Sequence, residues 1–263
     1  MHTPCIFLAA TAFGLSITSF IFGKETTEIN DRVHAVYQAI VRIEVVSERG
    51  SNGRMLKSGS TGSGVIIDSS GLVVTNHHVA GKATRLTCRL YDGEEVGADL
   101  LGADALTDLA VLRLRLEDRP KDAQSLTTAV FADSDLVRVG DPCFAMGSPA
   151  GLSQSVTRGI ISNLALISNR SGSFRLDGEN VGELVRWLGY DAVIFPGNSG
   201  GPLVNQQGEI IGINEVAIAS LGGAIPSNLA KSVSLELAEK GYIERSWIGL
   251  ECQPFIQTPN RGF

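Results

Sequence analysis

Short apolar runs of strand length, separated by glycine-rich turns, dominate this chain and limit what it can fold into. Many short strands at close spacing are typical of all-β sandwiches and barrels. The hydrophobic fraction of 43% is sufficient for a sizeable core. We therefore predict an all-β fold with two sets of strands, joined by the polar stretch 115–126. The predicted strands are residues 41–45, 64–67, 72–75, 85–90, 98–102 and 109–114, then 142–146, 154–161, 191–194, 203–204 and 209–213.

Two segments have the period of a short helix instead. In residues 31–40 the apolar side chains Val33, Val36, Tyr37 and Ile40 follow the i, i+3, i+4, i+7 spacing of one helix face. A second helix is predicted over 227–240, with Ser227 as its N-cap and Gly241 at its end. The stretches 47–63 and 168–183 are rich in glycine and serine, and we predict flexible loops there.

The segment FPGNSGGPL, residues 195–203, places one serine between glycines. This pattern predicts a tight turn that projects the Ser199 hydroxyl, because Gly197 can adopt backbone angles closed to other residues. The N–H groups of Gly197 and Ser199 would then converge as an oxyanion hole, with Asn198 shaping the turn. A glycine-rich turn with a serine is more often a plain turn, so this interpretation depends on partners elsewhere.

A serine nucleophile needs a base to take its proton, and the chain has four histidines. His2 lies in the leading apolar segment and His34 in the predicted helix. His77 and His78 follow an apolar strand, where an imidazole can be held at the edge of a cleft. Adjacent residues of an extended strand point to opposite faces, so only one of the two would face Ser199.

The candidate for the acid that orients this base is Asp108, which directly precedes the apolar run 109–114. A buried carboxylate is costly unless it is hydrogen-bonded, and a histidine Nδ1–H would satisfy it. The alternative is an aspartate that caps a turn before a strand, which is the commoner role of a lone Asp. The order His, Asp, Ser is that of chymotrypsin and differs from the order in α/β-hydrolases and subtilisins.

Several segments resemble those of HtrA-type (Deg) serine proteases, a branch of the chymotrypsin-like superfamily, and they occur in the family's order across residues 35–240. In the family motif the catalytic histidine directly precedes the valine, which assigns His78 as the general base. The matching segments are GSGVII at 62–67, TNHHV at 75–79, TDLAVL at 107–112, VGD at 139–141, MGSP at 146–149, GL at 151–152, VTRGIIS at 156–162, PGNSGGPLVN at 196–205 and AIPS at 224–227.

The resemblance implies a chymotrypsin-like double six-stranded β-barrel with short helices. It also implies a serine endopeptidase that hydrolyses unfolded or misfolded exported proteins through an acyl-enzyme. The protease domain would occupy residues 24–240, with barrels over 35–115 and 127–226 and a helix over 227–240. His78, Asp108 and Ser199 would form the catalytic triad, and neither a cofactor nor a metal is implied. Family members also form homotrimers through this domain.

By the same resemblance, Ile213, Asn214 and Glu215 are the substrate-binding residues of the primary pocket. The sequence departs from the family pattern in two places. The stretch between Asn214 and Ala224 is short, and the usual Phe before Ala224 is missing. The tail 241–263 resembles the start of a PDZ domain, without a complete one.

Residues 6–23 form an uncharged apolar run followed at once by Lys24 and Glu25. Its length lies between that of a signal peptide and that of a minimal membrane span. We predict a signal peptide or membrane anchor over residues 1–23, so that the protein is exported to the periplasm or held outside the membrane by this segment alone. A buried N-terminal helix of a cytosolic protein is the alternative.

Charge and cysteine content narrow the function further. A net charge of −6 argues against nucleic-acid binding. No Cys-x-x-Cys pair occurs, which disfavours a zinc site. Cys5 belongs to the leader, so an odd number remains: Cys88, Cys143 and Cys252. Cys88 and Cys143 lie in apolar strands and are predicted to be buried thiols, although one disulfide is compatible with export.

A catalytically silent holdase that binds unfolded chains is the main alternative function, because an intact triad can sit in a collapsed loop arrangement. An esterase is a further alternative within the same chemistry. Cleavage of an unfolded protein, and the dependence of that cleavage on Ser199, distinguishes the protease from the holdase.

Overall fold

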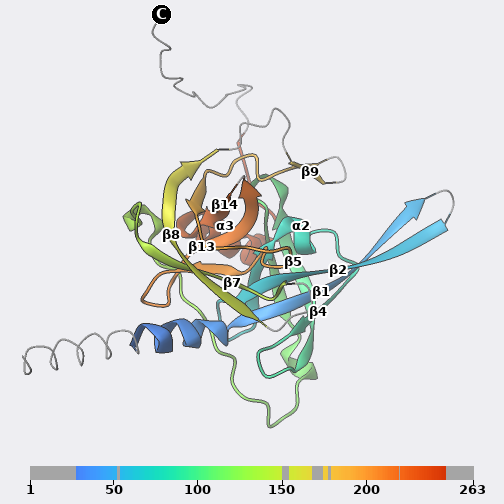
Figure 1. The fold of residues 1–263 in the computed structure, drawn as a ribbon. Coiled ribbons are helices and arrows are strands. Elements are labelled where there is room, and N and C mark those ends of the chain that lie inside the picture. The colour runs from blue at the N-terminus through green and yellow to red at the C-terminus, as the bar shows by residue number, and fades with distance from the viewer. Residues whose placement is uncertain are drawn as a thin grey trace, which may run out of the picture.

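The computed structural model describes residues 28–246, except for 52–53, 150–153, 168–173, 177–178 and 219. Two closed six-stranded barrels dominate this part of the chain (Figure 1). The predicted all-β double-barrel fold is confirmed. The predicted leader 1–23, residues 247–263 of the tail, Cys5 and Cys252 lie outside the described residues.

The first barrel has the strand order β1-β2-β3-β6-β5-β4, and each neighbouring pair that closes it is antiparallel. Its strands are β1 (Ile40–Ser51), β2 (Arg54–Ile66), β3 (Leu72–Asn76), β4 (Arg85–Arg89), β5 (Glu95–Asp104) and β6 (Leu109–Leu114). The helix α2 (His77–Ala80) follows β3, and the 3₁₀ turns η1 (Ala105–Thr107) and η2 (Leu116–Asp118) flank β6.

The second barrel has the order β11-β14-β13-β12-β7-β8. Its strands are β7 (Pro142–Gly147), β8 (Ser155–Leu166), β11 (Trp187–Tyr190), β12 (Pro202–Val204), β13 (Ile210–Ile218) and β14 (Leu221–Pro226). A 3₁₀ turn, η3 (Ser134–Leu136), precedes it, and a separate hairpin pairs β9 (Phe174–Leu176) with β10 (Glu179–Val181).

Each barrel has its own apolar interior, and a third cluster joins them. Cys88 on β4 lies in the first interior and Cys143 on β7 in the second, and both are free thiols. Burial raises the pKa of each thiol to about 12, so both stay protonated. The joining cluster includes Val111, Met146 and Ile213 together with side chains of α3 (Ser227–Lys240). The two barrels are therefore held in a fixed relation to each other.

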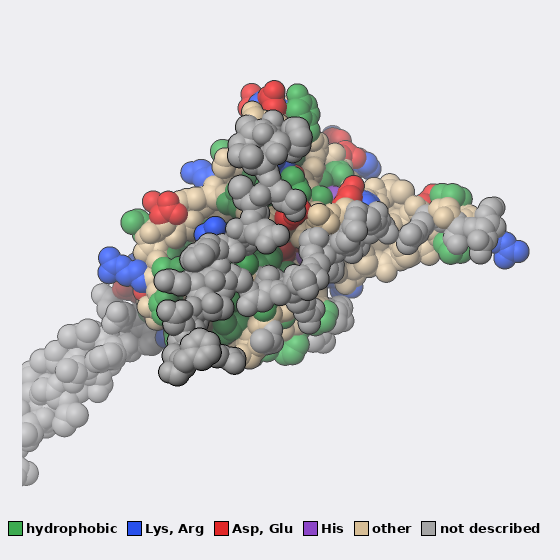
Figure 2. Space-filling model, turned by 90° about the horizontal axis from the view of Figure 1, so that it is seen from above, with side chains coloured by type: hydrophobic (Ala, Val, Ile, Leu, Met, Phe, Trp, Pro, Cys, Tyr) green, Lys and Arg blue, Asp and Glu red, His purple; other side chains and the backbone are tan. Residues whose placement is uncertain are grey.

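The stretch 47–63, predicted to be a flexible loop, forms the outer part of a long hairpin instead. The β1–β2 ladder runs without a break in register from Ile40↔Val65 to Ser51↔Arg54. The arm stands away from the barrels in Figure 1, and Figure 2 shows hydrophobic and basic side chains near its end. Because Arg54–Thr61 are exposed, neither face of the arm needs apolar residues, so the alternation that marks a strand is absent.

Two smaller predictions are wrong. Residues 191–194 are not a strand, because the Asp191 carboxylate accepts a hydrogen bond from the Ile160 N–H at 2.7 Å and the chain leaves the sheet there. β11 lies just before it, at Trp187–Tyr190. Ser227 is the first residue of α3 rather than its N-cap, since its hydroxyl donates to the Ala132 carbonyl at 2.7 Å.

The helical predictions are otherwise close. Residues 28–37 are helical, three residues earlier than the predicted 31–40. Gly241 ends α3 in the left-handed conformation (φ 82°) with its N–H bonded to the Leu237 carbonyl. Within 168–183, predicted to be a loop, the β9–β10 hairpin forms. No helix among the described residues has the length and apolar character needed to span a membrane.

Candidate active site

The imidazole of His78 and the carboxylate of Asp108 form a tight pair in the first barrel. His78 Nδ1 lies 2.6 Å from Asp108 Oδ2, and the backbone N–H of His78 donates to Asp108 Oδ1 at 2.9 Å. Asp108 is fully buried, whereas the His78 side chain is 22% exposed. Since both carboxylate oxygens accept from His78, the Nδ1–H tautomer is favoured and Nε2 carries the lone pair that a general base needs.

Asp108 reaches this position through an unusual backbone conformation. It follows η1 with φ 53°, and it is the one non-glycine residue of the described chain with positive φ. Aspartate tolerates this left-handed region better than most residues. Its carbonyl accepts from the His77 N–H and from Asn76 Nδ2, each at 3.0 Å. These bonds tie the turn that carries Asp108 to the end of β3, directly before His78.

His77 points elsewhere. Its side chain is 7% exposed, and its Nε2 lies 3.2 Å from the Glu179 carboxylate on β10, which also pairs with Lys82. His78, and not His77, is therefore the histidine that pairs with Asp108. That only one of the two faces Ser199 stays a prediction. The reason that the two side chains diverge differs from the predicted one, because both residues lie in the helix α2 rather than in a strand.

Ser199 lies in a chain of tight turns contributed by the second barrel. The Asn198 N–H donates to the Phe195 carbonyl at 3.0 Å, which closes a turn with Pro196 and Gly197 at its centre. Gly197 has φ 103°, the sign that a type II turn requires at this position. The Ser199 hydroxyl donates to the carbonyl of Glu215 at 3.2 Å.

Backbone donors beside Ser199 are open for an incoming ligand. Within the described part of the chain, the N–H groups of Gly197 and Ser199 donate to no acceptor. Two free N–H groups flanking a serine are what an oxyanion hole requires. Asn198 is 1% exposed, and its Nδ2 and Oδ1 have no partner among the described residues, so its side chain is enclosed in the turn rather than presented to a substrate.

The two halves of the site meet through Ser63 on β2 of the first barrel. Its hydroxyl donates to the Gly197 carbonyl at 2.5 Å and accepts from the Ser148 N–H at 2.8 Å. Its backbone N–H donates to the Ser199 carbonyl at 2.9 Å. The turn that carries Ser199 is thus fastened to the barrel that carries His78 and Asp108.

Gly200 packs too closely for any side chain. Its φ is 85°, and a Cβ there would lie 2.1 Å from the Ser63 carbonyl oxygen and 2.3 Å from Thr75 Oγ1. Gly93 has nearly the same φ of 89°, but a Cβ there would meet nothing within 4 Å.

We expect Gly200→Ala to lower the free energy of unfolding by about 3 kcal/mol or more, since steric overlap adds to backbone strain. Gly93→Ala carries the strain without the overlap and should cost only about 1 kcal/mol. Urea denaturation of both variants measures the difference. Equal losses would show that the close approach at Gly200 contributes nothing to stability.

The three predicted substrate-binding residues have buried side chains. Ile213 and Asn214 are fully buried, and Glu215 is 7% exposed. Asn214 is held by three hydrogen bonds, donating to the carbonyls of Met146 and Pro202 and accepting from the Tyr190 hydroxyl. Within this segment, the backbone oxygen of Glu215 accepts a hydrogen bond from the Ser199 hydroxyl.

Sequence reasoning missed what the Glu215 side chain does. Its carboxyl lies beside the carboxylate of Asp108 and accepts a hydrogen bond from Trp187 Nε1. Burial raises its pKa well above the usual range, and the Asp108 charge adds to the effect. The signal was present in the sequence, because Glu215 is the one charged residue in the strand 210–218.

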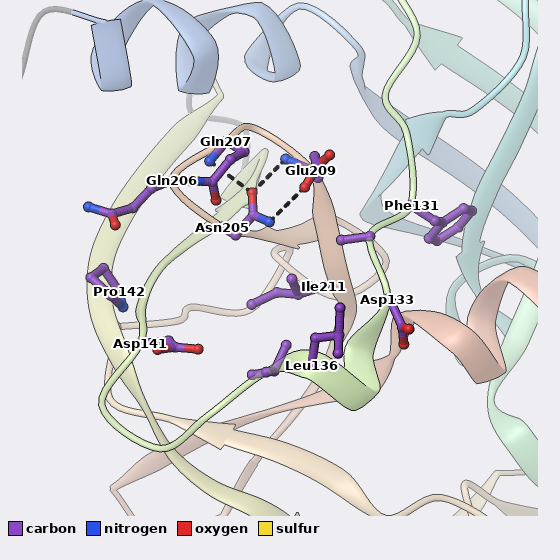
Figure 3. Close-up of a pocket in the computed structure, with 12 residues that line it drawn as sticks. Phe131, Asp133, Leu136, Asp141, Pro142, Asn205, Gln206, Gln207, Glu209 and Ile211 are labelled. Carbon is purple, nitrogen blue, oxygen red and sulfur yellow. Dashed lines mark hydrogen bonds between the residues drawn. The ribbon is translucent and has the colours of Figure 1, made fainter. Parts of the chain in front are cut away.

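The pocket drawn in Figure 3 is separate from these residues. It lies between η3, the start of β7 and the β12–β13 turn, and its lining includes Phe131, Asp141 and Ile211. Asn205 crosses one side of it and donates to Glu209 at 3.0 Å. Because neither His78, Asp108 nor Ser199 lines it, this pocket is not the candidate active site. Within the described residues, no cluster of three His, Cys, Asp or Glu is arranged to hold a metal ion.

Two six-stranded barrels that bring a histidine–aspartate pair and a glycine-framed serine together define the class of trypsin-like peptidases. A family model described as a trypsin-like peptidase domain matches residues 62–213. The solved structure of the HtrA-type protease AlgW with a decapeptide has a TM-score of 0.70 and 30% identity, covering 87% of this chain and 73% of that chain. The chain belongs to the HtrA-type branch of the trypsin-like peptidases.

Curated relatives agree with this assignment. The serine protease Do-like HtrA of Bacillus subtilis (strain 168) is 38% identical over 256 residues, covering 90% of this chain and 54% of the relative. The periplasmic serine endoprotease DegP of Escherichia coli (strain K12) is 41% identical over 211 residues, covering 77% of this chain and 41% of the relative. The chain therefore spans about half or less of the length of these relatives.

Proposed function

We propose that this protein is a serine endopeptidase that hydrolyses unfolded or misfolded polypeptides outside the cytoplasm. The observation that carries the proposal is the 2.6 Å contact between His78 Nδ1 and the buried Asp108, beside a serine whose neighbouring N–H groups are open. Membership of the HtrA-type family supports the reaction, and the serine protease and endoprotease names of the relatives do so as well.

In the proposed mechanism, Ser199 Oγ attacks the scissile carbonyl and His78 Nε2 takes its proton. The Asp108 carboxylate holds the imidazole in the Nδ1–H tautomer and stabilises the imidazolium that forms. The N–H groups of Gly197 and Ser199 hold the developing oxyanion. His78 returns the proton to the leaving amine, and water then releases the acyl group by the same steps in reverse. In each step the negative charge on the oxyanion forms together with the positive charge on the His78 imidazolium, so the net charge of the site does not change.

Substrate binding by residues 213–215 is proposed to use their backbone. The side chains of Ile213 and Asn214 are buried and fully engaged, so they support the wall of the site from behind. The carbonyl of Glu215, which accepts the Ser199 hydroxyl at 3.2 Å, faces the site. A peptide substrate would be recognised at this edge mainly through its main chain, which suits a protease of unfolded chains.

The remaining assignments follow the family. We infer a protease domain over residues 24–240 after a signal peptide or membrane anchor at 1–23, and a tail over 241–263 that begins like a PDZ domain. The name of the Escherichia coli relative supports a periplasmic site of action. We further propose a homotrimer and unfolded polypeptides as the partners, with the membrane contacted only through residues 1–23.

The test is digestion of reduced casein by the purified chain, with fragment termini read by mass spectrometry. We expect cleavage, and we expect none after the protein has been treated with a fluorophosphonate, which phosphonylates reactive serines with loss of fluoride. If most casein fragments end after a few residue types, those residue types give the specificity of the primary pocket. Absence of cleavage, combined with protection of unfolded casein from aggregation, would overturn the peptidase assignment in favour of a holdase.

A further inference from the structure

Glu215 occupies an irregular place in its strand. In the β13–β14 ladder, Asn214 pairs with Ala224 and Val216 with Gly223, so Glu215 is an extra residue without a partner. Such bulges redirect one side chain and are frequent beside active sites. Here the bulge turns a carboxyl inward, where it is 7% exposed.

Three neighbours enclose this carboxyl. Trp187 on β11 donates its indole N–H to Oε2. Gly182, just after β10, lies against Oε1, since a Cβ at that glycine would be 2.5 Å from it. The third neighbour is the carboxylate of Asp108, whose negative charge acts directly on Glu215.

Two carboxyls in contact inside a protein cannot both be charged, so this pair holds one proton. Asp108 accepts two hydrogen bonds from His78, one from the backbone N–H and one from Nδ1. Glu215 accepts a single bond from a neutral indole. Hydrogen bonds to a charged oxygen stabilise the charge, so the negative charge resides on Asp108 and the proton on Glu215.

We propose that Glu215 is a positioning residue of the active site, a protonated carboxyl that donates a hydrogen bond to Asp108 and so helps to fix the orienting acid. This rests on the proposed peptidase function and adds a fourth member to the proposed triad of Ser199, His78 and Asp108. The role needs a carboxyl in its acid form, with one end donating to Asp108 and the other accepting from Trp187.

The arrangement has a consequence for the pH dependence of activity. The groups that face Glu215 are the Asp108 carboxylate from the η1–β6 turn, the neutral Trp187 indole from β11 and the uncharged Gly182, with His78 of α2 one hydrogen bond further on. The contacts described for Glu215 include no cation that could offset a second negative charge beside Asp108. Ionisation of Glu215 at alkaline pH would remove the donor and place a second negative charge against Asp108.

We expect kcat/KM for labelled casein to fall on the alkaline side of its pH profile in the parent protein, and this decline to be absent in Glu215→Gln. Glutamine keeps one donor for Asp108 and one acceptor for Trp187, so Glu215→Gln should lose less activity at neutral pH than a variant that lacks both contacts. Glu215→Ala removes both contacts and should lose about 10- to 100-fold. An alkaline decline that is the same in the parent and in Glu215→Gln would overturn the proposal.

A spectroscopic test is independent of activity. In the Ser199→Ala protein at pH 8, infrared spectra should contain the carbonyl stretch of one protonated carboxyl, and Glu215→Gln in the same background should abolish it. Glu236→Gln is the matched control, since hydrogen bonds from the Glu244 N–H and Lys240 lower the pKa of Glu236 and keep it ionised. Absence of the band from the protein that retains Glu215 would overturn the proposal, whether or not the chain proves to be a peptidase.

Stability gives a third readout. The pKa of Glu215 is raised in the folded protein, whereas in the unfolded chain it returns to about 4.3. Between these values only the unfolded state is ionised, so raising the pH favours unfolding by about 10-fold in the equilibrium constant per pH unit. We expect Glu215→Gln to gain stability relative to the parent from pH 5 upwards in urea denaturation. Parallel curves for the two proteins would contradict a protonated Glu215.

Discussion

Replacing Ser199 by alanine is expected to lower kcat for casein hydrolysis by about 10⁴- to 10⁶-fold, because no acyl-enzyme can form without the serine hydroxyl. The side chain contributes little to the fold, since its hydroxyl makes one hydrogen bond of 3.2 Å to the Glu215 carbonyl. We therefore expect the variant to unfold at nearly the same urea concentration as the parent. Single-turnover and steady-state digestion assays measure the loss.

The control for this experiment is Ser58→Ala, which removes an exposed hydroxyl from the β1–β2 arm. Its activity should equal that of the parent. Ser199→Ala should also lose labelling by a fluorophosphonate, which Ser58→Ala should keep. A Ser199→Ala protein that still digests casein at more than about a hundredth of the parental rate would exclude Ser199 as the nucleophile.

Replacing Asp108 by asparagine is expected to reduce kcat by about 10⁴-fold. Both carboxylate oxygens of Asp108 accept hydrogen bonds from His78, at its backbone N–H and at Nδ1. Asparagine has one side-chain acceptor, so its amide nitrogen must face one of these groups. If it faces Nδ1, the imidazole takes the other tautomer and Nε2 can no longer accept the serine proton.

Asparagine is the suitable substitution here because it also tolerates the positive φ of 53° at this position. Asp99→Asn makes the same change in charge at an exposed carboxylate that pairs with Arg115, and should leave kcat unchanged. Histidine NMR can follow the tautomer of His78 in the Asp108→Asn protein. Full activity in that protein would show that the 2.6 Å contact does not serve catalysis.

The sequence predicted the barrels well because several of their strands are buried along most of their length. Residues 109–114 and 142–146, for example, are apolar runs that became β6 and β7. The arm at 47–63 escaped detection because a two-stranded ribbon satisfies its backbone through pairing alone and needs no apolar face. The strand predicted at 191–194 lies four residues too late in the chain, because β11 ends at Tyr190 and the Asp191 side chain then takes the place of a strand partner for Ile160.

The candidate site could be predicted only in part, since its members are far apart in the chain. The family pattern distinguished His78 from His77, but the reason they diverge is a helical turn tied to the Asp108 carbonyl. The resemblance to HtrA-type proteases implies only that Glu215 is a pocket residue. A bulge that rotates one residue out of register cannot be read from residue types, so its contact with Asp108 appears only in three dimensions.

The fastening of the serine turn to Ser63 links catalysis to the association of the barrels. The turn that carries Ser199 belongs to the second barrel, while Ser63, which binds it through two hydrogen bonds, and the proposed general base His78 belong to the first. Neither barrel alone contains all of the proposed catalytic groups, so we expect neither to be active on its own. Enzymatic activity therefore reports whether the two barrels are associated. A chain whose barrels are folded but separated would keep its strand content and have no catalytic activity.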